Sequence, residues 1–367
     1  MKRATRLAAL AGVAALVLSA CGQAPEETAG DGATGATDGA TAASDFVACM
    51  VSDEGGFDDQ SFNQSGHEGL TRARDELGIQ IRQAESQADT DFGPNIDNMI
   101  QQGCDLIIGV GFKLEDPIQA AADANPDVKF ALVDSSFSDD DFNPVTVPNA
   151  KPILFNTAEA AFLAGYLAAG MTETGTVATF GGMQIPSVSV FMDGFYDGVQ
   201  QFNTDNDADV TLLGWNKDTQ QGSFTGDFSN VPLGQNLAQG FIDQGADIIM
   251  PVAGPVGLGA AAAASDAGKK IIWVDSDGFL TTDHGDIILT SVMKQIGPAV
   301  FDVIKAASEG NFSPDPYIGT LENEGVGLAP FHDFESAVPA EVSEQLDAFK
   351  AKIISGDLTI ESPNSPK

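Results

Sequence analysis

An α/β fold with two doubly wound parallel-sheet lobes around a central cleft is predicted by three observations. Short apolar strands alternate with helical segments from residue 46 onward, which is typical of a parallel sheet covered by helices on both faces. This alternation runs through once and then starts again near residue 157. About 320 residues take part, more than one hydrophobic core usually supports.

The first round of alternation predicts one sheet and its covering helices. Two helices end at glycines, Gly78 and Gly103, which is a common helix stop signal. The predicted strands are 46–51, 80–84, 105–109 and 129–133, with a possible fifth at 144–147. The predicted helices are 61–77, 93–102 and 117–125.

The second round predicts another sheet with helices that are rich in small residues. Its strands are expected at 176–180, 210–213, 247–251, 270–274 and 287–291. Its helices are expected at 158–171, 190–202, 234–244 and 257–267. A helix at 294–309, a strand at 317–321 and a helix at 340–355 should then cross back between the lobes, and the tail at 361–367 should be frayed.

These elements predict how the chain is divided. A signal peptide is expected at 1–20 and a disordered acidic tether, beginning with a lipidated cysteine, at 21–45. The first lobe should comprise 46–156 plus 293–315, and the second lobe 157–292 plus 316–358.

Two pairs of similar segments place the cleft. GCDLIIGVG resembles GADIIMPVAG, and KFALVDSS resembles KIIWVDSD; the latter two are buried strands that end in Val-Asp-Ser. Ligands of open parallel sheets bind beyond the carboxyl ends of the strands. Asp134 and Asp275 are therefore expected to face one cleft from opposite lobes, which could close over a ligand.

The N-terminal segment has the features of a secretory signal. Basic residues precede a short apolar run, which is too short to span a membrane, and Leu-Ser-Ala-Cys follows it. This ending resembles a bacterial lipobox, which implies a lipid on Cys21; the alternative is an ordinary signal peptide with an incidental cysteine. Residues 22–45 have no large apolar side chain and should form a disordered tether.

The charge excludes polynucleotide binding. The chain has 17 basic and 53 acidic residues, a formal net charge of −36, and such a protein repels nucleic acid and anionic lipid. Any membrane attachment should therefore be through the lipid anchor only. We interpret the charge as a device for solubility, for example in a salty environment.

The sequence offers few groups for catalysis or metal binding. There is no His/Cys cluster with metal spacing, no G-x-S-x-G nucleophile motif and no P-loop, so we expect no metal, no cofactor and no enzymatic activity. Cys49 and Cys104 could form one disulfide or remain two separate buried thiols.

One segment carries a family resemblance. VSDEGGFDDQSFNQSGHEG, which starts at Val51, is similar to the signature of the basic membrane protein family of ABC-transporter substrate-binding lipoproteins. The likeness continues through NIDNMIQQGCDLIIGVGF, EAAFLAGYLAAGM, VAGPVGLGA, WVDSDG and LTSVMK. It implies a type I periplasmic-binding-protein-like fold, a purine nucleoside as ligand, and ABC permease subunits as partners of a monomer.

The resemblance also implies roles for individual residues. Asp53 would contact the ligand, Phe62 would stack on the base with Asn63 beside it, and Asp134 would accept from the base edge. Without the resemblance, Phe62 would be interpreted as a core residue, and the acids as helix caps.

The remaining implied contacts lie further along the chain. Either Asp275 or Asp277 would hold the ribose hydroxyls, and Lys294 would be a basic ribose contact. The glycine-rich loop would run from Gly254 to Gly257.

The chain departs from the family pattern at one aromatic position. The second stacking aromatic is replaced by Met250, or by the neighbouring isoleucine, and Pro255 interrupts the expected Gly-Gly pair. A thioether can still pack on a ring.

Three classes of function are compatible with this sequence. A transport receptor for a nucleoside is favoured by the export signal, the tether and the paired lobes. A sugar receptor of the same architecture and a ligand sensor that docks on a membrane partner are the alternatives. A secreted nucleoside hydrolase that uses clustered acids would need a positioned base and usually a metal, and the sequence has no nucleophile motif such as G-x-S-x-G and no set of metal ligands.

Overall fold

The computed structural model describes residues 45–139, 141 and 143–367. The predicted signal peptide, Cys21 and nearly all of the predicted tether lie outside these residues. The described residues belong to one compact unit. Among the described helices, none combines the length and the apolar character needed to cross a bilayer.

The first lobe is built on a six-stranded parallel sheet in the order β13-β5-β4-β3-β1-β2. The strand LIIGV shows why it is buried on both faces: Ile108 packs into the core cluster beneath helix α1, while Ile107 packs into the cluster beneath α2 and α3. The strands are β1 (Val47–Ser52), β2 (Gln80–Ala84), β3 (Leu106–Val110), β4 (Lys129–Val133), β5 (Ala150–Phe155) and β13 (Tyr317–Gly319). The helices are α1 (Phe62–Leu77), α2 (Asp89–Gln101), α3 (Glu115–Ala124) and α9 (Ile296–Ser308).

The second lobe is built on a six-stranded sheet in the order β14-β12-β11-β10-β6-β7, parallel except for β14. Its strands are β6 (Thr176–Gly181), β7 (Thr211–Leu213), β10 (Ile248–Val252), β11 (Lys270–Asp275), β12 (Ile288–Lys294) and β14 (Val326–Leu328). Its helices are α4 (Ala158–Met171), α5 (Pro186–Asn206), α6 (Val231–Asp243), α7 (Val256–Asp266), α8 (Gly278–Thr281) and α10 (Ala340–Ser355). A small hairpin, β8 (Trp215–Asn216) and β9 (Gln221–Gly222), lies beside it.

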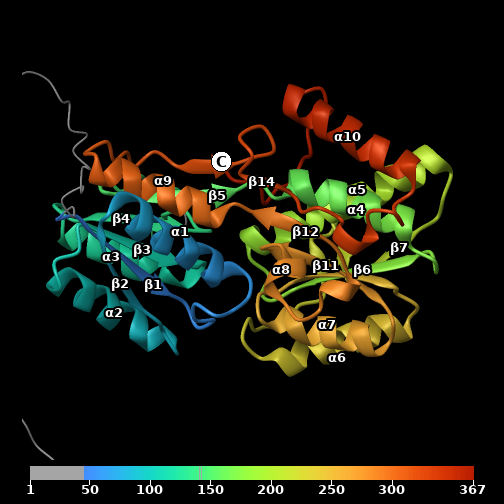
Figure 1. Ribbon diagram of the computed structural model, residues 1–367, viewed down its shortest axis with the longest axis horizontal. Helices are drawn as coiled ribbons and strands as arrows, with labels where there is room; N and C mark the ends of the chain where they lie inside the picture. Colours follow the sequence, from blue (N-terminus) through green and yellow to red (C-terminus); the bar gives the residue numbers. More distant parts are fainter. Residues whose placement is uncertain (1–44, 140, 142) are drawn as a thin grey trace, which may run out of the picture. The chain divides into compact units, whose positions relative to one another are not determined.

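Helices cover both faces of the second sheet. Figure 1 shows α4 and α5 on one side and α6 and α7 on the other. Glycines let α4 and α5 approach closely, because a Cβ at Gly165 would lie 2.1 Å from the carbonyl oxygen of Phe195. The two doubly wound lobes and their parallel sheets confirm the predicted fold class.

Three strand and tail predictions were wrong. The fifth strand is Ala150–Phe155 rather than 144–147. Pro152 argued against a strand there, because proline has no backbone N–H to donate a hydrogen bond between strands. Strand β13 was expected in the second lobe, but it pairs in parallel with β5 of the first. The tail is not frayed, because Ser362 Oγ and Asn364 Nδ2 donate to the buried Asp193 carboxylate at 2.6 and 2.8 Å.

A disulfide joins Cys49 to Cys104, and their Cα atoms are 6.0 Å apart. Cys49 lies in β1, and Cys104 comes just before the neighbouring strand β3. Of the two possibilities that the sequence left open, the structure shows the bridge. It links β1 to the start of its neighbouring strand β3 in the first sheet.

Candidate functional site

A cavity of about 70 Å³ lies where the two lobes meet, and residues of both lobes line it. The first lobe contributes strand ends and the start of α1, while the second lobe contributes α5, the loop before α6 and the ends of β10, β11 and β12. The carboxyl ends of strands from both sheets therefore face this cavity.

Two acids and a lysine form the buried centre of the site. Asp134 follows β4, Asp275 ends β11 and Lys294 ends β12. Lys294 Nζ lies 2.5 Å from Asp134 Oδ2 and 3.5 Å from Asp275 Oδ1, and its side chain is 3% exposed. The ion pair between Asp134 and Lys294 joins the two lobes.

The two acids share an unusual backbone conformation. Asp134 has φ 70° and Asp275 has φ 69°, in the left-handed region that non-glycine residues seldom adopt. Strained residues of this kind cluster at ligand sites, where the surrounding structure holds them. The Val-Asp-Ser similarity in the sequence thus corresponds to the same strained turn in each lobe.

Burial and charge determine the protonation of this centre. Burial raises the pKa of Asp134, and the nearby Lys294 only partly offsets that effect. Burial also opposes the charge of Lys294, but attraction to Asp134 and Asp275 outweighs it, so the pKa of Lys294 is raised. Lys294 therefore remains an ammonium group with three hydrogen-bond donors.

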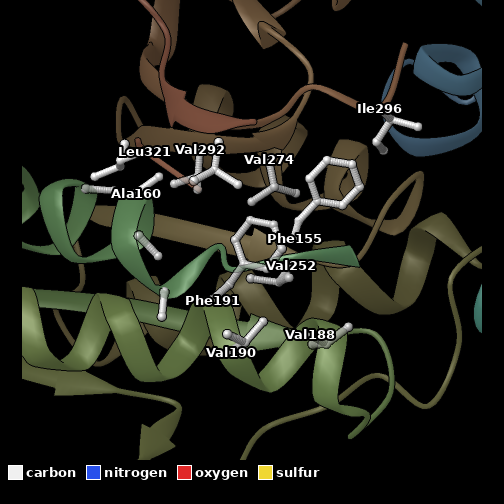
Figure 2. Packing of buried hydrophobic residues seen from close by; sticks show 14 of the residues in the cluster. Phe155, Ala160, Val188, Val190, Phe191, Val252, Val274, Val292, Ile296 and Leu321 are labelled. Atoms are coloured by element: carbon white, nitrogen blue, oxygen red, sulfur yellow. The ribbon is translucent and has the colours of Figure 1, made fainter. Parts of the chain in front are cut away.

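Aromatic rings surround the ammonium group. Lys294 Nζ lies 5.3 Å from the ring centroid of Phe62, 5.0 Å from that of Phe191 and 6.0 Å from that of Phe155. Cations at such distances are attracted to ring faces. Figure 2 shows Phe155 and Phe191 in one apolar cluster with Val252 and Val274. Phe62 and Phe191 both line the cavity, so flat apolar surfaces lie next to the charged centre.

A second polar group lies at the end of β1. Asp53 Oδ1 accepts from Asn63 Nδ2 at 2.7 Å and from the Gly55 amide at 3.3 Å. Burial raises the pKa of Asp53, and these hydrogen bonds only partly counter it. Asn63 Oδ1 is buried and has no hydrogen-bond partner among the described residues.

Asp59 fixes the start of α1, although it was not among the site residues predicted from the sequence. Its carboxylate accepts from the backbone amides of Ser61, Asn63 and Gln64 at 2.8 to 3.0 Å. Burial raises its pKa to about 6. The sequence did contain a signal for this role, because Asp59 lies three residues before the start of α1 and acids near helix starts often accept hydrogen bonds from the first backbone amides.

Aromatic and charged residues at the remaining wall were not predicted from the sequence either. Phe112 of the first lobe and Phe228 of the second lie 6.4 Å apart between ring centroids. Lys113 pairs with Glu54 at 3.0 Å. Phe112 and Lys113 lie in a single 3-10 turn, Phe112–Leu114, while Glu54 and Phe228 lie in irregular segments, so no periodic pattern marks these residues.

Three of the predicted site residues do not line the cavity. Met250 is fully buried within the second sheet, and Gly257 lies against Trp273 at the start of α7. Asp277 caps α8 through the Phe279 amide, and its other oxygen is 2.8 Å from His332 Nε2. The lining does include the other predicted residues: Asp53, Phe62, Asn63, Asp134, Gly254, Asp275 and Lys294.

Comparison with known proteins now identifies the family. A family model described as "ABC transporter substrate-binding protein PnrA-like" matches residues 46–364. The chain belongs to this PnrA-like family. It is therefore a substrate-binding protein of an ABC transporter, as the resemblance to basic membrane proteins predicted.

Relatives of this PnrA-like protein span nearly its whole length. It is 30% identical over 339 residues to the "ABC transporter nucleoside-binding protein BmpA" of Lactococcus lactis, covering 87% of this chain and 90% of the relative. It is also 30% identical to a "CD4+ T-cell-stimulating antigen" of Listeria innocua, over all of both chains. A solved ABC transporter solute-binding protein from Aeropyrum pernix superimposes with a TM-score of 0.77 and 26% identity, covering 87% of this chain and 94% of that one.

Proposed function

We propose that this chain is an extracytoplasmic lipoprotein that binds a nucleoside, preferably a purine nucleoside, between its lobes and delivers it to ABC permease subunits. The single observation that carries the proposal is the pairing of a buried Asp134–Lys294–Asp275 centre with aromatic cavity walls. The nucleoside-binding name of the Lactococcus relative supports the same ligand class.

The polar centre suits the sugar of a nucleoside. Carboxylates accept strong hydrogen bonds from hydroxyl groups, and an ammonium group donates to hydroxyl oxygens. Asp275 Oδ1 makes only a long ion pair with Lys294 Nζ, at 3.5 Å, so this oxygen can also accept a hydrogen bond from a ribose hydroxyl. We assign Asp275, rather than Asp277, to the ribose, because the carboxylate of Asp277 is engaged with α8 and His332.

The aromatic walls suit the base. Phe62 lines the cavity beside Lys294, and stacking of a base on an aromatic ring contributes roughly 1–3 kcal/mol in nucleic-acid-binding proteins. Met250 cannot supply the second wall, since it is buried away from the cavity. Phe228, which lines the cavity from the second lobe, is the ring that we assign to this role instead.

The charge of the lining favours a nucleoside over its phosphate ester. Asp53, Asp59 and Asp134 line the cavity together with Glu54 and Asp275, whereas Lys113 and Lys294 are the cations among the described lining residues, and both are already paired. A phosphate group would therefore add repulsion without finding a free cation.

Attachment to the membrane rests on the sequence alone. The lipobox-like Leu-Ser-Ala-Cys predicts a diacylglyceryl group on Cys21, followed by a tether that would hold the binding domain near the permease. A single acyl chain binds membranes weakly, so a lipoprotein anchor with several chains fits this role. We propose that the protein acts as a monomer.

Calorimetric titration of the refolded, ligand-free protein tests the proposed ligand. The panel is guanosine, inosine, adenosine, cytidine, ribose and guanosine monophosphate. We expect heat from the purine nucleosides, less from cytidine, and none from ribose or the monophosphate. Binding of ribose alone would support the sugar receptor instead and would contradict the base-stacking role of Phe62.

A further inference from the structure

A short turn of the first lobe, Asp59–Ser61, reaches across to the second lobe just before α1 begins. Ser61 is fully buried, and its Oγ lies 3.1 Å from Asp275 Oδ2 and 3.2 Å from the carbonyl oxygen of Val274. These partners are more than 200 residues away in the sequence and belong to the other sheet. A single hydroxyl group thus joins α1 of one lobe to β11 of the other.

The residue before Ser61 makes a second inter-lobe contact. The backbone carbonyl oxygen of Gln60 accepts from Ser276 Oγ at 2.9 Å and from Thr281 Oγ1 at 3.0 Å. Gln60 has φ 57°, a left-handed conformation that is costly for a residue with a side chain. This strain is compensated by the Asp59 carboxylate, which binds the amide of Ser61 and thereby fixes the turn.

We propose that Gln60 and Ser61 form an inter-lobe latch, and that Ser61 is a positioning residue for Asp275. When the latch is engaged, Ser61 occupies Asp275 Oδ2 and leaves Oδ1, whose ion pair with Lys294 Nζ is long at 3.5 Å, as the acceptor for the ligand. Closure of the lobes and orientation of the carboxylate are then one event.

The latch has a consequence for closure without ligand. All of its hydrogen bonds join protein groups to protein groups, so the latch shifts the lobes toward the closed arrangement whether or not a ligand is bound. A receptor that is already partly closed before the ligand binds has a higher apparent affinity, because less of the binding free energy is used to close the lobes. The effect on ligand affinity rests on the proposed function, whereas the effect on closure does not.

The first test measures closure alone. Small-angle X-ray scattering of the refolded, ligand-free protein compares wild type with Ser276→Ala plus Thr281→Val, which remove both donors to Gln60. The matched control is Thr282→Val, because Thr282 Oγ1 donates within its own lobe, to the Gly278 carbonyl oxygen at 2.7 Å. We expect a larger radius of gyration for the latch variant only. An equal radius for wild type, latch variant and control would overturn the latch.

The second test measures the positioning role of Ser61. We expect Ser61→Ala to weaken guanosine binding on the order of tenfold, because it loses hydrogen bonds and part of the closed population. Ser61→Thr keeps a hydroxyl and should restore part of that affinity. Ser65→Ala is the control, since Ser65 Oγ donates to the Ser61 carbonyl oxygen within the first lobe.

A double-mutant cycle separates positioning from general stability. If Ser61 acts through Asp275, Ser61→Ala should cost little affinity in an Asp275→Asn background. Additive losses would contradict the positioning role. If guanosine does not bind wild type at all, the proposed function fails, while the scattering comparison still decides whether the latch exists.

Discussion

At the scale of single residues, the site depends on one buried ammonium group between two carboxylates. Lys294 is nearly inaccessible, and its closest acid, Asp134, comes from the opposite lobe. A buried charge that loses its partner is expensive, because neither water nor another ion replaces it. Lys294 therefore both lines the cavity and joins the two lobes.

Removing this charge should destabilise the protein strongly. We expect Lys294→Met to lower the free energy of unfolding by about 3–5 kcal/mol, because two buried acids are left facing each other. Denaturant unfolding measures the change. Lys113→Met is the control, since Lys113 is partly exposed and should cost less than about 1 kcal/mol. Equal losses for the two variants would contradict the central role of Lys294.

The raised pKa of Asp53 predicts how ligand binding depends on pH. We propose that Asp53 contacts the ligand as an ionised hydrogen-bond acceptor, and protonation of its carboxylate removes this acceptor. Burial raises the pKa of Asp53, so this protonation occurs at a higher pH than for an ordinary aspartate. Guanosine affinity should therefore begin to fall, as the pH is lowered, above the usual range of about 4. Titrations from pH 8 to 4.5 measure this. Asp53→Asn should bind more weakly and show a smaller pH dependence; an unchanged pH profile in the variant would exclude Asp53 as its source.

At the scale of elements, the role of a glycine within a helix depends on how closely that helix packs against its neighbour. Gly165 of α4 has no room for a side chain, because a Cβ would lie 2.1 Å from the Phe195 carbonyl oxygen of α5. Gly240 of α6 has open space around it, since a Cβ added there would meet no other atom within 4 Å. The same residue type therefore has opposite roles in two helices of one lobe.

The pair Gly165→Ala and Gly240→Ala tests this distinction. We expect Gly165→Ala to destabilise the second lobe by a few kcal/mol, on the order of 1–3, because α4 and α5 must separate. Gly240→Ala should instead stabilise by up to about 1 kcal/mol through helix propensity. Thermal unfolding of both variants measures these changes in stability. If Gly165→Ala left the stability unchanged, α4 and α5 would be able to move apart easily.

Most strands could be predicted because burial on both faces produces short apolar runs between turn residues. The strand Ala150–Phe155 was missed because it contains a proline, which usually argues against a strand. Pro152 is tolerated because pairing with β13 begins only at the next residue, Ile153. The order of β13 in the first sheet could not be predicted, since three residues carry no information about which lobe they join.

The site was predictable where residues follow strand ends and unpredictable where loops supply them. Asp134 and Asp275 were placed correctly, because strand ends in parallel sheets converge. Met250 was misplaced, because alternation along β10 turns it into the core. Phe112, in a short 3-10 turn, and Phe228, in an irregular segment, come close only in the folded protein.

At the scale of the whole molecule, the formal net charge of −36 is unusually large for one chain. Like charges on a folded surface repel one another and favour expansion, and dissolved salt screens this repulsion. The described salt bridges on helix surfaces, such as Arg72 with Glu76, are too few to balance the acids.

Salt should therefore stabilise this protein. We expect the melting temperature to rise between 0.05 and 1 M NaCl, where the screening length falls to about 3 Å. Calorimetric scans measure the change, and equal osmolarity of sucrose serves as the control for excluded-solute effects. A melting temperature that is flat or falls with NaCl would show that surface repulsion contributes little.

We propose that a nucleoside binds between the lobes, with its base on Phe62 and its ribose at Asp275 and Lys294. A crystal structure of the refolded protein with guanosine is the sharpest test of this placement. We expect the ribose hydroxyls within hydrogen-bond distance of Asp275 Oδ1 and Lys294 Nζ, and the purine ring against Phe62 and Phe228. A base directed at Asp275 and Lys294, or a ligand bound outside the cleft, would show that the placement is wrong.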